Sequence, residues 1–269
     1  MAARQLRVSW PHAVRRARRP AIAPNDASAT PPVIAEAREG LRALQAPLTA
    51  GLTLDESAQA FLGSLFLIRC VRNLAAVLTL CEAGWAPEAQ TLLRAMVEDM
   101  VTVSYISTEP DVLAAKWLGF ENRRLPGREE LIAAFAGTEA PEREDRPKYE
   151  RWTRLSFNAM AERADSVVPG LTEYLGYVYP ILSDRAHGNT SASGLYVHVR
   201  PDGSVEPLFR PSPNQVAITV CNAVTAALTT ADRAKALGVE IELGPIEEAE
   251  RRIYEACGMP TGTVPDITG

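Results

Sequence analysis

The chain has 269 residues, of which 46% are hydrophobic and 23% charged, and it carries a net charge of −5. This composition is ordinary for a soluble globular protein and long enough for a sizeable core. Alanine and leucine are abundant, which favours helix over sheet. No stretch reaches the roughly 20 consecutive apolar residues of a membrane span, so we expect no membrane partner.

The charge is unevenly distributed along the chain. Residues 1–20 hold six arginines and no acid, which leaves 22 basic residues against 33 acids in the rest. An acidic body disfavours non-specific binding to nucleic acid, so we do not favour that class of partner. We expect residues 1–31 to form a disordered basic arm and linker, residues 32–258 a single helical domain, and residues 259–269 a flexible tail.

The cysteines indicate neither disulfide bonds nor a metal site. They contain no CxxC pair and no ligand spacing typical of structural zinc (Cys70, Cys81, Cys221 and Cys257). We therefore expect reduced and mostly buried thiols in a cytoplasmic protein, with no metal and no cofactor.

Helical patterns follow one another with few interruptions. Helices are expected near 33–46, 53–84, 88–107, 109–125, 127–137, 149–165, 171–188, 211–238 and 244–258. The longest has Thr53 as its expected N-cap, Glu56 completing a capping box and Gly84 at its end. Pro87 suits the first turn of the next helix. The tryptophans in or next to these segments are expected to anchor the bundle (Trp85, Trp117 and Trp152).

The pattern changes only between Leu195 and Arg210. There "GLYVHVRPDGSVEPLF" alternates apolar and polar residues around a Pro-Asp-Gly turn, which predicts a small hairpin. The fold class that we predict is an all-α, multi-helix bundle with one small β-hairpin insertion (about 195–210).

A narrow polar stripe runs along the helix expected over 88–107. Arg94 and Glu98 are four residues apart and meet on one face, which also collects Thr91, Thr102 and Tyr105. The remaining faces are apolar, as in a helix that is buried on most sides. The stripe is either a solvated ion pair or the lining of a cleft.

A second set of polar residues lies in the middle of the longest expected helix. Arg69, Arg72 and Asn73 share a face within an otherwise apolar run. If that face meets the stripe with Glu98, the arginines would surround the carboxylate and favour a bound anion. The alternative is that they face water.

The segment "YPILSDRAHGNTSASG" is the third candidate. In a helix, Tyr179, Ser183 and His187 lie along one side, and Gly188 is expected to end that helix just after His187. His187 is then either a helix-capping residue or a general acid/base or anion ligand, with Arg185 close by. A hydrolase triad of Ser183, Asp184 and His187 is excluded, because one helical turn cannot place the imidazole in line with both partners.

Several familiar site classes are absent from the sequence. It has no GxGxxG loop after a strand, no GxxxxGK[ST] loop, no HExxH and no paired ExxH. Common nucleotide-binding loops and the usual zinc and di-iron motifs are thus excluded.

The segments "AGWAPEAQTLLRAMVEDMVTVSYIST" and "YVYPILSDRAHG" resemble an uncharacterised bacterial helical family, the domain of unknown function family 5677. The resemblance covers about 60–210. Its motifs are a Gly-x-x-x-Glu-Ala turn, an Arg-x-x-x-Glu pair and a Tyr-x-x-x-Ser-x-x-x-His segment. They fall on Gly84, Glu88, Ala89, Arg94, Glu98, Tyr179, Ser183 and His187. The resemblance implies no established activity.

A weaker similarity is to HEPN-like helical ribonucleases and toxins. Those proteins separate an arginine and a histidine by four to six residues near a helix N-terminus. Here Arg185 and His187 are two apart, at an expected helix C-terminus. Both departures weaken the similarity.

Our leading hypothesis is a binding or regulatory module for a small polar or anionic ligand, in a bacterial defence or stress setting. Its candidate catalytic residues are His187, Arg94 and Glu98. Further ligand-binding residues are expected at Arg69, Arg72, Asn73, Tyr179, Ser183 and Arg185. One alternative is a metal-independent ribonuclease or phosphodiesterase that uses His187. Another is a structural dimerisation bundle, and a homodimer is left open in either case.

Overall fold

The computed structural model describes residues 32–50, 57–124, 152–186, 197–200, 203–207 and 213–256. That part of the chain contains eight helices, and the predicted all-α class is confirmed. The helices are α1 (Pro32–Ala50), α2 (Ala58–Glu82), α3 (Ala86–Ile106), α4 (Pro110–Arg124), α6 (Phe157–Ala164), α7 (Leu171–Ala186), α8 (Pro213–Ala236) and α9 (Gly244–Ala256).

Two three-residue strands, β1 (Val197–Val199) and β2 (Val205–Pro207), pair antiparallel with His198 opposite Glu206. They fall within the range predicted for a hairpin, 195–210. The parts of that range on either side of the strands are not among the described residues, so the folded insertion stays a prediction. The expected arm over 1–31, the helix expected over 127–137 and the tail over 259–269 also lie outside them.

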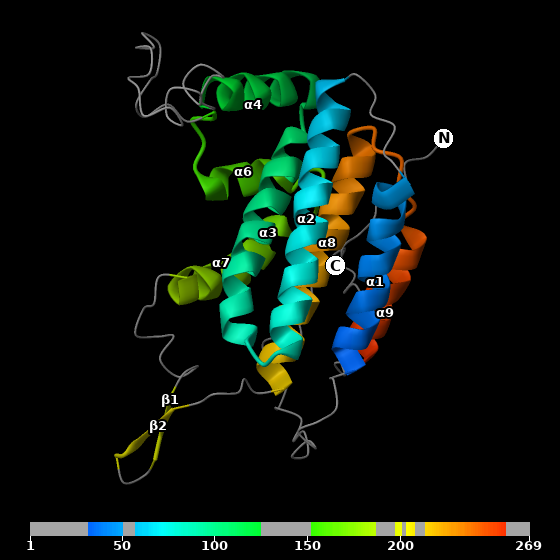
Figure 1. Cartoon of the computed structure of the whole chain (residues 1–269). Coiled ribbons are helices and arrows are strands. Elements are labelled where there is room, and N and C mark those ends of the chain that lie inside the picture. The colour runs from blue at the N-terminus through cyan, green and yellow to red at the C-terminus, as the bar shows by residue number, and fades with distance from the viewer. Residues whose placement is uncertain are drawn as a thin grey trace, which may run out of the picture.

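Helices α2, α3 and α8 form the centre of the bundle. Each of the three packs against the other two, and α1 packs against α2, α8 and α9. Helix α4 contacts α2, whereas α6 and α7 pack against α3. Figure 1 shows α2 between α3 and α1, with α8 behind it, α4 across its N-terminal end and α9 beside α1. The C-terminal helices α8 and α9 thus pack against the N-terminal ones, α8 against α1, α2 and α3, and α9 against α1.

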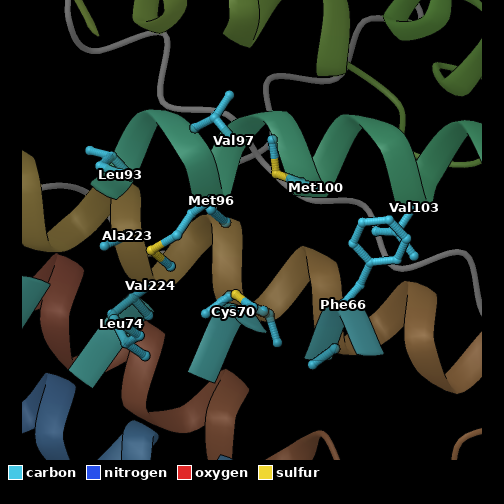
Figure 2. Close-up of a cluster of buried hydrophobic side chains, with 14 of the residues drawn as sticks. Phe66, Cys70, Leu74, Leu93, Met96, Val97, Met100, Val103, Ala223 and Val224 are labelled. Carbon is cyan, nitrogen blue, oxygen red and sulfur yellow. The ribbon is translucent and has the colours of Figure 1, made fainter. Parts of the chain in front are cut away.

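The core lies where α2, α3 and α8 meet. Figure 2 shows Phe66, Cys70 and Leu74 of α2 in one buried cluster with Met96 and Met100 of α3. All five are at most 1% exposed. Cysteines 70, 81 and 221 are buried, as predicted. Trp117 packs edge-on against Phe66 and Trp152 against Tyr105, each with ring centroids 5.6 Å apart. Trp85, in contrast, is 55% exposed, so its predicted anchoring role is wrong.

Helix α2 is apolar around most of its circumference, and it is the one described helix with the length and composition to cross a membrane. Of its most apolar window, 56% is buried inside the protein. Since α3, α8, α1 and α4 all contact it, many of its apolar residues belong to the core of the bundle.

The ends of α2 are set by local hydrogen bonds. Ser57 is the N-cap, and its hydroxyl accepts from the backbone N–H of Ala60 at 3.2 Å. The prediction of Thr53 as the cap was therefore wrong, because the helix begins one turn later; Thr53 and Glu56 lie outside the described residues. At the other end Gly84 has a φ of 84°, which confirms the predicted stop.

Ser57→Ala is expected to lower the free energy of unfolding by about 1 kcal/mol, because it leaves an orphan N–H at the start of α2. Urea unfolding followed by circular dichroism measures the change. The matched control is Thr79→Ala, whose hydroxyl donates only to the Ala75 carbonyl of its own helix. Equal effects from both substitutions would contradict a capping role.

Candidate functional site

Three polar side chains from two distant segments meet between α3 and α7. On α3, the Arg94 Nε donates to the Glu98 Oε1 at 3.0 Å. On α7, the Tyr179 hydroxyl donates to the same oxygen at 2.9 Å and accepts from the Arg94 Nη2 at 3.3 Å. These hydrogen bonds close a triangle that we call the Arg94–Glu98–Tyr179 cluster.

Two aromatic contacts also hold the cluster, and one of them comes from a third helix, α6. The Arg94 guanidinium carbon lies 5.4 Å from the centroid of the Tyr179 ring, within cation–π range. Phe157 of α6 packs on that ring with centroids 4.5 Å apart. Ser156 caps α6 by accepting from the Ala159 N–H, so the position of Phe157 is fixed by the start of its helix. Glu98 and Tyr179 therefore hold Arg94, and Phe157 of α6 holds the Tyr179 ring.

The cluster is partly open to solvent. The Arg94 side chain is 21% exposed and that of Glu98 is 43% exposed. Burial opposes the charge on Arg94, but hydrogen bonds with Tyr179 and Glu98 outweigh it and raise its pKa. Burial and the hydrogen bond to Glu98 raise the pKa of Tyr179, despite the opposing effect of Arg94. At neutral pH the cluster thus offers a fixed cation and a neutral phenol, and no phenolate base.

The other α7 residues of the predicted site are described only in part. Ser183 is half-buried, one helical turn after Tyr179. Arg185 is placed on α7 by its backbone, and α7 runs to Ala186, close to the predicted helix end. His187 lies outside the described residues, so its predicted position beside Arg94 and Glu98 stays a prediction.

A second ion pair, which the sequence analysis missed, lies on the neighbouring face of α3. The Arg69 Nη2 of α2 lies 3.1 Å from the Oδ1 of Asp99. Asp99 is 6% exposed, and its other oxygen, Oδ2, is buried without a hydrogen-bond partner among the described residues. Burial raises the pKa of Asp99 to about 6, with Arg69 opposing and Glu98 adding to the shift.

This second pair changes the expected arrangement of arginines. Arg69 pairs with Asp99, so the described contacts of Glu98 come from Arg94 and Tyr179 and not from a ring of arginines. Arg72 is exposed and Asn73 half-buried on α2. The signal that could have pointed to Asp99 was an acid inside an apolar helix, one residue after Glu98 and therefore about 100° around the helix axis.

The described residues contain no group of three or more histidine, cysteine or acidic side chains that could hold a metal ion. Burial raises the pKa of Cys70 to about 12, which keeps that thiol neutral. The Arg94–Glu98–Tyr179 cluster can supply hydrogen bonds and charge to a bound molecule.

Comparison with known proteins gives a family and no more. A search of curated proteins and a search of solved structures both return no match. The similarity to HEPN-like proteins finds no support. The sequence model described as "Family of unknown function (DUF5677)" matches residues 60–204, more than half of the chain. That range contains all three residues of the Arg94–Glu98–Tyr179 cluster and confirms the predicted resemblance, so the chain belongs to the DUF5677 family.

Proposed function

We propose that the protein is a cytoplasmic bacterial binding module, and that its ligand is a small polar or anionic molecule which contacts the Arg94–Glu98–Tyr179 cluster. The observation that supports this most is a guanidinium held by Glu98 of its own helix and Tyr179 of α7 and still 21% exposed. The expected setting is bacterial defence or stress.

A fixed guanidinium favours ligand binding for an energetic reason. A free arginine loses rotamer freedom when it binds, at a cost of roughly 0.5–1.5 kcal/mol. Here Glu98 and Tyr179 already restrict the side chain, so much of that cost is met on folding. The planar fork also matches a carboxylate or phosphate group better than a lysine would.

Glu98 narrows the class of ligand. Its carboxylate is 43% exposed and next to the guanidinium, so a purely anionic molecule would be repelled by it. A ligand that carries an anionic group beside a hydroxyl or amino donor can place the anionic group on the Arg94 guanidinium and the donor on the Glu98 carboxylate. We therefore favour an amino acid or a hydroxy acid over inorganic phosphate.

The proposal extends to Ser183, Arg185 and His187, which follow Tyr179 along or just beyond α7. The predicted hairpin insertion over about 195–210 comes next in the chain and is part of the same proposal. Arg69 is engaged by Asp99, so we assign it, with its neighbours Arg72 and Asn73, no direct ligand contact. In the ribonuclease alternative His187 acts as the acid/base and Arg94 or Arg185 stabilises the transition state, and His187 lies outside the described residues.

Arg94→Lys is expected to weaken ligand binding about 10- to 100-fold, because it removes the fork that makes charge-assisted hydrogen bonds of about 1.5–3 kcal/mol. A thermal-shift screen with glutamate, citrate, lactate and phosphate identifies a probe, and calorimetry then measures its affinity. Arg42→Lys, on the exposed side of α1, is the matched control.

Two results would contradict the proposal. One is a screen in which none of the four probes raises the melting temperature. The other is a probe that binds Arg94→Lys as tightly as the unmodified chain. Tyr179→Phe keeps the ring over Arg94 and removes only the hydroxyl. It therefore separates the contribution of the hydroxyl to binding from the contribution of the ring to stability.

A further inference from the structure

Helix α9 is the last helix that the structure describes, and it lies at the edge of the bundle beside α1 (Figure 1). It packs against α1 and α8. Three of its 13 residues are buried, whereas twelve of the 25 residues of α2 are. A helix with so few buried side chains can open locally while the central helices stay folded.

A carboxyl group joins α9 to α8. The Thr225 hydroxyl of α8 donates to the Glu250 Oε1 at 3.1 Å. The Tyr254 hydroxyl, one turn after Glu250, lies 2.7 Å from the Thr225 Oγ1. Because Thr225 gives its single hydrogen to Glu250, the Tyr254 hydroxyl donates to Thr225. Thr225 is 2% exposed and Glu250 is half-buried, so this contact lies inside the interface between the two helices.

No cation in the described part of the chain pairs with this carboxyl. The nearby arginines are engaged in other ion pairs: Arg251 with Glu248 and Glu255, Arg252 with Glu36 of α1, and Arg233 with Asp232 of α8. Glu247 adds a negative charge to the surroundings of Glu250, and Tyr174 of α7 acts on Tyr254. The partners of the Glu250 carboxyl across the interface are thus neutral hydroxyls.

We propose that the docking of α9 on α8 is a pH-sensitive switch, closed while the Glu250 carboxyl is protonated and opened by its ionisation. A carboxylate without a cation is costly to bury, so an ionised Glu250 gains solvation when α9 moves away from Thr225. The ion pairs of Arg251 lie within α9 and do not depend on docking. Opening therefore uncovers the faces of α1 and α8 that α9 covers, while the Arg94–Glu98–Tyr179 cluster belongs to other helices.

The direction of the switch follows from the environment of Glu250. Burial raises its pKa to about 7 from an ordinary value of 4.5, with the Thr225 hydrogen bond opposing and Glu247 adding to the shift. An open α9 exposes the carboxyl to water, where the ordinary value applies. Opening is therefore least populated below about pH 4.5, grows as the pH rises, and levels off near pH 7.

Hydrogen exchange of the full chain, measured by mass spectrometry and corrected for the intrinsic pH dependence of exchange, tests the switch. Between pH 5 and pH 7.5 the protection of the α9 amides is expected to fall about 50-fold. At each pH it should stay below the protection of the α3 amides, which marks local opening. In Glu250→Gln the fall should be less than about threefold, because the titrating group is gone.

Two further variants keep the test specific. Glu248→Gln is the matched control, since Glu248 is an exposed acid of the same helix that pairs with Arg251, and it should keep the 50-fold fall. Ile253→Ala removes a side chain that is 0% exposed and should lower α9 protection at every pH.

Three results would overturn the proposal. The first is a fall in Glu250→Gln as large as in the unmodified chain. The second is equal protection of the α9 and α3 amides, which would mean that α9 opens only with the whole bundle. The third is unchanged α9 protection in Ile253→Ala, because exchange in α9 would then not depend on docking.

Discussion

Phe66→Ala is expected to lower the free energy of unfolding by about 3–5 kcal/mol, the largest effect among the substitutions considered. Phe66 is 1% exposed in the centre of α2 and packs edge-on against Trp117 of α4. Figure 2 shows its ring beside Val103 of α3. Removing the ring therefore opens a cavity where three helices meet, and rigid neighbours fill such a cavity only in part.

The measurement is urea unfolding followed by circular dichroism. Phe61→Ala is the matched control, because Phe61 is on the same helix and 46% exposed. It should cost less than about 0.5 kcal/mol, as surface substitutions usually do. A loss below about 1 kcal/mol for Phe66→Ala would mean that α4 is not packed against α2 as described.

The helices themselves followed from local patterns in the sequence. Apolar periodicity and glycine stops placed α2 and α3 within a few residues of their observed bounds, because both signals act over one or two turns. The N-cap of α2 was misplaced since Thr53 and Ser57 are both suitable capping residues four positions apart. Pro180 lies inside α7, which continues as one helix across it.

The candidate site could be predicted only in part. The Arg94–Glu98 pair is local and was found from its spacing of four. That Tyr179 meets this pair depends on which face of α7 packs on α3, which periodicity within α7 does not determine. Tyr105 was assigned to the polar stripe, but it is 4% exposed and packs on Trp152, because a tyrosine ring suits either a polar or an apolar face.

Asp99 leads to the second large effect, a loss of stability as the pH rises. Its carboxyl lies between α2 and α3 with one oxygen on Arg69 and the other buried without a described partner. Burial raises its pKa to about 6 from an ordinary value of 3.8, so folding favours the neutral acid. The stabilising contribution is therefore complete below about pH 4 and is lost as the pH rises through about 6.

The size of this contribution follows from the pKa difference of about two units, which corresponds to about 3 kcal/mol. Asp99→Asn removes the titration and keeps an acceptor for Arg69. The free energy of unfolding of Asp99→Asn, relative to that of the unmodified chain, should thus increase by about 3 kcal/mol between pH 4 and pH 7.5. Urea unfolding at half-unit steps of pH measures this difference.

A second buried acid makes the comparison between variants necessary. Glu250 of α9 accepts a hydrogen bond from Thr225 of α8 at 3.1 Å, and burial raises its pKa to about 7. Ionisation of Glu250 also lowers the free energy of unfolding as the pH rises. The pH dependence of the unmodified chain alone would therefore not separate Glu250 from Asp99. Glu250→Gln is the matched control, and its own difference should level off near pH 7 instead of near pH 6.

Arg69→Met tests the cause of the Asp99 shift. Because the guanidinium opposes the effect of burial, its removal should raise the pKa of Asp99 further and move the pH at which the Asp99 difference levels off to a higher value. The Arg94–Glu98–Tyr179 cluster, on the neighbouring face of α3, should keep its affinity for a probe at pH 7.5 in this variant. If the difference in unfolding free energy between Asp99→Asn and the unmodified chain stays flat with pH, water reaches the carboxyl. That result would contradict the burial of Asp99 between α2 and α3.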